Sequence, residues 1–127
     1  MKAMRKVTMM VALVALMMAL FATAAYAVNK QCTNLRCEGT NNRDTLIERG
    51  GDGVSDNIYG LQRNDLLDAT SFTDDTDNLY GGPGNDTLDA TDGDDLDTLT
   101  GGKGTDSCFG DTGDTFSGCE FINGVAA

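Results

Sequence analysis

The sequence of 127 residues contains no histidine, no tryptophan and a single proline. Histidine is the side chain that most often serves as a general acid or base near neutral pH, so its absence removes the usual catalytic triads. No serine lies in a nucleophile elbow. Acidic residues are plentiful, but they follow a repeat instead of converging on one cleft. We therefore expect no enzymatic activity.

Basic residues are scarce beyond residue 27, where six Lys or Arg residues stand against all 20 acidic residues, a net charge of −14. Large apolar side chains are also few there, which places this part of the chain on the disordered side unless a ligand stabilises it. We do not expect so acidic a chain to bind nucleic acid or anionic lipid, because both require basic surfaces.

Residues 1–27 have the pattern of a signal peptide: a positively charged start, an uncharged apolar run from residue 7, and the cleavage motif Ala25-Tyr26-Ala27. The alternative is an uncleaved membrane anchor, because the uncharged stretch is almost long enough to span a bilayer. The small residues that crowd the end of the run favour cleavage. We predict a secreted or cell-surface protein with no membrane attachment after cleavage.

An Asp-x-apolar triplet returns at nearly regular intervals along most of the remaining chain. The aspartates that open the triplets are Asp44, Asp56, Asp65, Asp77, Asp86, Asp97, Asp106 and Asp114. Every second one, up to residue 106, lies about 21 residues further on. A period of this length indicates a solenoid, in which each coil buries its apolar residues against the next. The aspartates then form columns that repel themselves unless cations lie between them.

Two segments follow a stricter nine-residue pattern, G-G-x-G-x-D-x-U-x, in which U is a large apolar residue. Residues 81–89 (GGPGNDTLD) match it at every specified place, and residues 101–109 (GGKGTDSCF) differ only in a cysteine at the apolar place. The pattern resembles the RTX, or haemolysin-type, calcium-binding repeat. The degenerate copies that accompany these two are residues 39–47, 51–59, 60–68, 72–80 and 92–100.

The resemblance covers roughly residues 39–117 and implies an all-β fold for them, a right-handed parallel β-roll. Such a roll is a solenoid, here of about four coils. We expect an N-terminal cap over residues 28–38 and a C-terminal cap and tail over residues 118–127. Calcium is the cofactor that the resemblance implies.

Four cysteines follow the predicted cleavage site, at Cys32, Cys37, Cys108 and Cys119. An even number in a small exported domain predicts two disulfides, for which three pairings are possible. Because the two ends of a solenoid are far apart, the pairs Cys32–Cys37 and Cys108–Cys119 are favoured, each closing one end. Metal binding by these thiols is a weaker alternative, since the chain has neither a CxxC motif nor a histidine.

Each nine-residue copy is expected to form six turn residues and three strand residues. Glycines at the first, second and fourth places allow a tight turn, the sixth-place Asp adds a carboxylate, and the eighth-place residue points into the core. The expected core residues are Leu46, Ile58, Leu67, Leu79, Leu88, Leu99, Cys108 and Phe116. Successive turns lie at opposite edges: the first column holds Asp44, Asp65, Asp86 and Asp106, and the second holds Asp56, Asp77, Asp97 and Asp114.

Calcium suits the gap between two such turns. Stacked coils lie about 4.8 Å apart, so oxygens from neighbouring turns can share an ion at bond lengths of about 2.3–2.6 Å. Magnesium requires a stricter octahedron and keeps its waters, and softer metals prefer nitrogen or sulfur. The resemblance implies that backbone carbonyls and sixth-place aspartates hold the ion.

The best predicted site lies between turns 81–86 and 101–106, with Asp86 and Asp106 as carboxylate ligands. The glycines that would shape it are Gly81, Gly82, Gly84, Gly101, Gly102 and Gly104. In the second column Asp77 and Asp97 form the best pair, although this column departs from the pattern because residues 72–77 contain no glycine.

Further acidic residues complete the predicted ligand set. The neighbours expected to assist in the second column are Asp74, Asp75, Asp94 and Asp95, and the other sixth-place candidates are Asp56, Asp65 and Asp114. Beside Asp44 and Asp65, Arg43 or Arg63 could replace an ion by a salt bridge.

One apolar residue per half-coil makes a thin core, so we predict that Ca²⁺ stabilises or induces the fold. The alternative is a recognition module that binds polysaccharide or ice through a flat face. Threonines at seventh places could line such a face, but other residues interrupt the rows. Tyr59 and Tyr80, one coil apart, favour ordinary cross-strand packing over a sugar platform. The sequence indicates a structural or surface role and names no partner beyond calcium.

Overall fold

The computed structural model describes residues 26–33, 36–49, 55–71, 75–94 and 96–127. The predicted signal peptide lies almost entirely in residues 1–25, which are outside these ranges. Asp74 and Asp95 are also outside them. All regular structure in the described ranges is β-strand, and they contain no helix that could cross a membrane.

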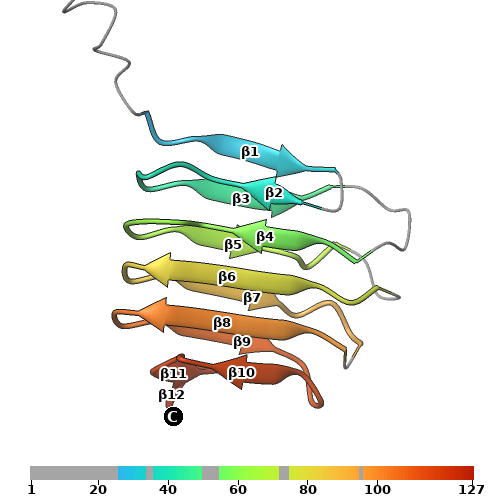
Figure 1. Cartoon of the computed structure of the whole chain (residues 1–127). Coiled ribbons are helices and arrows are strands. Elements are labelled where there is room, and N and C mark those ends of the chain that lie inside the picture. Colours follow the sequence, from blue (N-terminus) through green and yellow to red (C-terminus); the bar gives the residue numbers. More distant parts are fainter. Residues whose placement is uncertain (1–25, 34–35, 50–54, 72–74, 95) are drawn as a thin grey trace, which may run out of the picture.

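The strands form two sheets that face each other (Figure 1). The seven-stranded sheet has the order β1 (Asn29–Cys32), β3 (Thr45–Glu48), β5 (Leu66–Asp68), β7 (Thr87–Ala90), β9 (Ser107–Gly110), β11 (Phe121–Ile122) and β12 (Val125–Ala126). The five-stranded sheet has the order β10 (Thr115–Ser117), β8 (Thr98–Lys103), β6 (Asn78–Pro83), β4 (Asn57–Tyr59) and β2 (Cys37–Glu38). The chain alternates between the sheets, so one strand of each makes a coil of a β-solenoid with about four coils, as the repeat predicts.

The strand register reproduces the period of the sequence. In the larger sheet Leu46 pairs with Leu67, and Leu67 with Leu88; all of these pairings are parallel. In the smaller sheet Ile58 pairs with Leu79, and Leu79 with Leu99. Equivalent residues therefore stack in straight rows, because each coil adds 20 or 21 residues through most of the stack.

The core has one row of large apolar side chains from each sheet, with Ala69 and Ala90 buried beside the row of the seven-stranded sheet. Buried and partly exposed residues alternate along the strands, as in β3 and β7, because successive strand side chains point to opposite faces. Of the eight predicted core residues, seven are fully buried, and Phe116 in the last coil is partly buried against them. Five strands of the repeats are longer than the three residues predicted. Three of them, β3, β7 and β9, have four residues; β6 and β8 have six and include the first two glycines of the turn that follows.

Disulfides lie near both ends of the solenoid, with the pairing that its geometry favours. Cys32–Cys37 joins the end of β1 to the start of β2, and Cys108–Cys119 joins β9 to the segment after β10. The hairpin β11–β12 follows, and its antiparallel pairing is the exception in an otherwise parallel stack. Two disulfides indicate a non-reducing environment.

Candidate metal centre

The strands place the sixth-place aspartates in the two predicted columns. Each of these residues directly precedes a strand, as Asp86 precedes β7 and Asp97 precedes β8. Turns that lead from the five-stranded to the seven-stranded sheet form the first column, on the left in Figure 1, and the return turns form the second column on the right.

A ladder of hydrogen bonds ties the aspartates of each column together. The backbone N–H of each sixth-place residue except Asp114 donates to a carboxylate oxygen one coil further on, and the sixth-place side chains other than the half-buried Asp114 are buried between coils. The donor–acceptor pairs are Asp44 to Asp65 (2.7 Å), Asp65 to Asp86 (2.8 Å), Asp86 to Asp106 (2.7 Å), Asp56 to Asp77 (2.8 Å), Asp77 to Asp97 (2.7 Å) and Asp97 to Asp114 (3.1 Å). In the last coil Glu120 takes this place and accepts from Asp106 N–H at 2.8 Å.

The second carboxylate oxygen distinguishes inner coils from outer ones. At the ends it is satisfied locally: Asp44 Oδ2 accepts from the Thr40 N–H, and Asp114 Oδ2 accepts from the Asp111 N–H at 2.6 Å. In five inner residues Oδ2 is buried and has no hydrogen-bond partner in the described part of the chain; these are Asp65, Asp77, Asp86, Asp97 and Asp106. An inner carboxylate of this kind needs a cation or a proton.

In the first column a backbone carbonyl lies beside the unpartnered oxygen. The point that a Cβ on Gly81 would occupy is 2.5 Å from Asp86 Oδ2 and 2.7 Å from the carbonyl oxygen of Gly101, in the next coil. The corresponding point on Gly60 is 2.6 Å from Asp65 Oδ2 and 2.8 Å from the carbonyl oxygen of Gly81. Two acceptors therefore line the same space, which only glycine at the first place leaves open.

The other predicted glycines allow the turns to stack closely. Gly102 and Gly104 have φ values of 115° and 144°, and a Cβ on either would overlap the carbonyl oxygen of Gly82 or Gly84, respectively, in the preceding coil. The turns 81–86 and 101–106 thus direct carbonyl oxygens along the stack, as the nine-residue pattern implies.

The second column gathers its carboxylates more tightly. Three trios each have ligand oxygens within 4.8 Å of one another: Glu48, Asp75 and Asp77; Asp75, Asp92 and Asp94; and Asp94, Asp97 and Asp114. Neighbouring trios share a member, so the acidic groups form a continuous row along this edge. Among the described residues the trios lie in the column that departs from the repeat pattern, whereas Asp86 and Asp106 belong to none.

Two members of the trios, Glu48 and Asp92, were not predicted from the sequence. Both lie outside the sixth places on which the prediction relied. The period offered a signal for Glu48, because it is two residues after Leu46, at an inward place where the next two coils have Ala69 and Ala90. For Asp92 the sequence offered only a surface Asp-Gly turn.

The salt bridges considered for Arg43 and Arg63 do not form. The ion pair within the described ranges joins Arg36 to Glu38. Arg63 adopts a φ of 72° instead, and its backbone N–H donates to the carbonyl oxygen of Pro83 at 2.8 Å.

Burial raises the pKa of the inner carboxyls. For Glu48 the pKa rises to about 8, through burial first and the charge of Asp77 second. The pKa values of Asp65, Asp77 and Asp97 rise to about 7, that of Asp86 to about 6, and those of Asp92 and Asp106 rise as well. Burial is the main cause in each case, and a backbone hydrogen bond opposes it. Near neutral pH Glu48, Asp65, Asp77 and Asp97 therefore retain protons in part unless a cation compensates their charge.

The donor set fits a hard cation. Its donors are carboxylate and carbonyl oxygens, the chain has no histidine, and all four cysteines are in disulfides. The structure therefore contains buried acidic groups that could bind a metal ion. No protein-family model, curated protein or solved structure significantly matches the chain. The relationship to RTX repeats remains a prediction from the residues quoted above.

Proposed function

We propose that this chain is an exported calcium-binding protein whose β-solenoid is stabilised by Ca²⁺ held between its stacked acidic turns. It has no enzymatic activity in this proposal and serves a structural or cell-surface role. The observation that carries the proposal is the state of the inner aspartates: one oxygen is used in the ladder, and the other is buried without a partner.

Electrostatics supports a bound cation. Two unit charges about 5 Å apart repel each other by about 3 kcal/mol at an effective dielectric constant of 20. Each column stacks several carboxylates, so the repulsion accumulates along the solenoid. A cation between two turns replaces this repulsion by attraction, and each bound ion contributes about 2.7 kcal/mol to stability at a hundredfold excess over its Kd.

Calcium fits better than magnesium because the donors come from two coils and from both backbone and side chains. Such a set is irregular, and Ca²⁺ accepts six to eight oxygens in variable geometry, whereas Mg²⁺ demands a near-ideal octahedron. Export into calcium-containing surroundings agrees with the two disulfides and with the predicted signal peptide.

The alternative role, recognition of polysaccharide or ice by a flat face, gains no support. The seventh-place rows are mixed, with Asn57, Asn78, Thr98 and Thr115 on one sheet and Thr45, Leu66, Thr87 and Ser107 on the other. Tyr59 and Tyr80 stack with ring centroids 4.8 Å apart, and the Arg36 guanidinium lies over Tyr59. This is cross-strand packing of the kind that the sequence favours.

The test is circular dichroism of the oxidised chain from residue 28 onward during a titration with Ca²⁺, with Mg²⁺ as the control. We expect a gain in β-structure or in thermal stability with Ca²⁺ and little change with Mg²⁺. A full β-signal in chelator that Ca²⁺ neither increases nor stabilises would contradict the proposal.

A further inference from the structure

Glu48 occupies a core position. It ends β3, whose burial alternates, and it lies two residues beyond Leu46 on the inward-facing side. The strand register makes it equivalent to Ala69 and Ala90 in the next two coils, and both alanines are fully buried. A carboxylate thus stands where the neighbouring coils have a methyl group.

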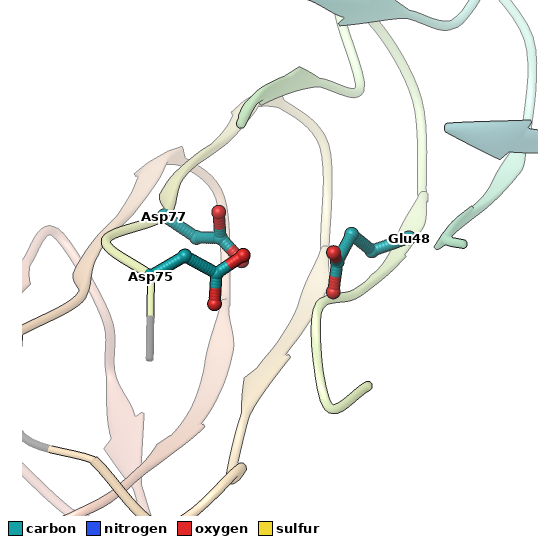
Figure 2. A group of neighbouring side chains, drawn as sticks. All are labelled: Glu48, Asp75 and Asp77. Atoms are coloured by element: carbon teal, nitrogen blue, oxygen red, sulfur yellow. The ribbon is translucent and has the colours of Figure 1, made fainter. Parts of the chain in front are cut away.

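This carboxylate has no well-formed hydrogen bond among the described residues, and the Ser71 backbone, which lowers its pKa, offsets burial only in part. Glu48 has 0% exposure, and neither Oε1 nor Oε2 has a hydrogen-bond partner in the described part of the chain. Its side chain points toward Asp75 and Asp77, which precede β6 in the next coil (Figure 2). Ligand oxygens of the three lie within 4.8 Å of one another, and all three side chains are buried.

Burial of an uncompensated charge is strongly unfavourable, and three carboxylates at such distances also repel one another. We propose that Glu48, Asp75 and Asp77 form a cation site inside the solenoid, separate from the positions between repeat turns. This inference goes beyond the proposed function, because Glu48 lies outside the nine-residue repeat; the two kinds of site share Asp77 and its neighbour Asp75.

Calcium is the cation that this site fits best. The three carboxylates offer several oxygen atoms besides Asp77 Oδ1, which accepts from the Asp56 N–H, and their burial disfavours the waters that Mg²⁺ retains. The site would tie the end of β3 to the turn before β6. It lies where residues 72–77 lack the glycines of the repeat, so it replaces a turn-to-turn site by one made of side chains.

The alternative occupants are protons. Burial and the charge of Asp77 raise the pKa of Glu48 to about 8, so a protonated Glu48 beside ionised aspartates is the competing state. The two states differ in how the protein responds when the Glu48 carboxylate is removed. If Glu48 holds a cation, its removal costs the protein one bound ion; if Glu48 is protonated, its removal leaves the number of bound ions unchanged.

The test uses protein expressed from the full-length sequence and recovered with both disulfides formed. Bound Ca²⁺ per chain is counted by calorimetric titration, and thermal midpoints are recorded in chelator and in excess Ca²⁺. The variant is Glu48→Ala, the residue that the next two coils carry at this position. Glu38→Ala is the control, since it removes a glutamate that is exposed.

We expect Glu48→Ala to bind one Ca²⁺ fewer than the wild type and Glu38→Ala to bind the same number. In chelator the midpoint of Glu48→Ala should equal or exceed that of the wild type, because a buried charge is gone; in excess Ca²⁺ it should lie below. An unchanged number of ions, with Glu48→Ala at least as stable in both conditions, would overturn the proposal.

The outcomes separate this site from the repeat sites. If the wild type binds no Ca²⁺ at all, both proposals fail; if Glu48→Ala binds the same number of ions as the wild type, only this one fails. Should Glu48→Ala not fold, Glu48→Gln takes its place, because it keeps the size of the side chain and removes its charge. One Ca²⁺ fewer than the wild type supports the buried site, and an unchanged number contradicts it.

Discussion

Substitution of Gly104 by alanine tests the close stacking of the repeat turns. Gly104 has a φ of 144°, a value that costs a non-glycine residue about 1–3 kcal/mol. A Cβ there would overlap the carbonyl oxygen of Gly84, so the two turns must separate. Separation breaks ladder bonds such as that from Gly84 N–H to the carbonyl oxygen of Lys103 (2.8 Å), at about 1 kcal/mol each. We expect the free energy of unfolding to fall by about 4 kcal/mol, which lowers the melting temperature by more than about 15 °C.

Gly124→Ala is the matched control. Gly124 also has a positive φ, of 78°, but a Cβ on it would meet no atom within 4 Å, so only backbone strain of about 1 kcal/mol is expected. Both variants are compared with the wild type by thermal unfolding followed by circular dichroism, with disulfides intact and Ca²⁺ in excess. If both lower the melting temperature equally, the turns do not stack as closely as described, and the reasoning is refuted.

Three further predictions concern ligands, core and pH. Asp86→Asn combined with Asp106→Asn keeps an acceptor for the ladder but removes carboxylate ligands. In excess Ca²⁺ the melting temperature should fall by about 10–20 °C, since one lost ion is worth about 2.7 kcal/mol at a hundredfold excess over Kd; an unchanged Ca²⁺ response would exclude this pair as ligands. Leu88→Ala, at a fully buried position, should cost about 2–5 kcal/mol in urea unfolding, whereas Leu96→Ala, at a position 54% exposed, should be near neutral; equal effects would contradict the assigned core. The third prediction concerns pH. In chelator, the inner carboxyls have pKa values between about 6 and about 8 in the folded chain, above their pKa of about 4 in the unfolded chain. The folded chain then binds more protons in this window, so its stability is greatest at acid pH and falls as pH rises through about 8. Thermal scans in chelator check this, and stability that grows with pH would contradict it.

The fold could be predicted from the sequence because the pattern repeats. The register of Leu46 on Leu67 and of Ile58 on Leu79 follows directly from a 21-residue period, since coils of equal length stack in only one way. The disulfide pairing followed as well, because a solenoid keeps Cys32 far from Cys108. Repetition reduces a problem of long-range contacts to one of neighbouring coils.

The candidate site was only partly predictable, because its chemistry departs from the repeat. The nine-residue pattern assigns one role to each of its positions. It therefore placed Asp77 in a column of turns but predicted no role for Glu48, which lies in a strand. The ladder was also missed: a pattern shows that Asp recurs, but not that one oxygen of Asp86 is taken by the Asp65 N–H. That division between the two oxygens depends on the rotamer of each Asp and on the backbone path of its turn, which residue types alone do not give.

The hairpin at the C-terminal end decides at which edge of the larger sheet a further strand can be added. A sheet edge can recruit another strand, and proteins guard such edges. At the C-terminal end of the larger sheet, β12 runs against the other strands, and only two of its residues pair with β11. A further parallel coil has no matching register to continue there. At the opposite end β1 is the edge strand among the described residues and pairs with β3 in parallel over four residues, so the parallel register of this sheet can be continued from β1.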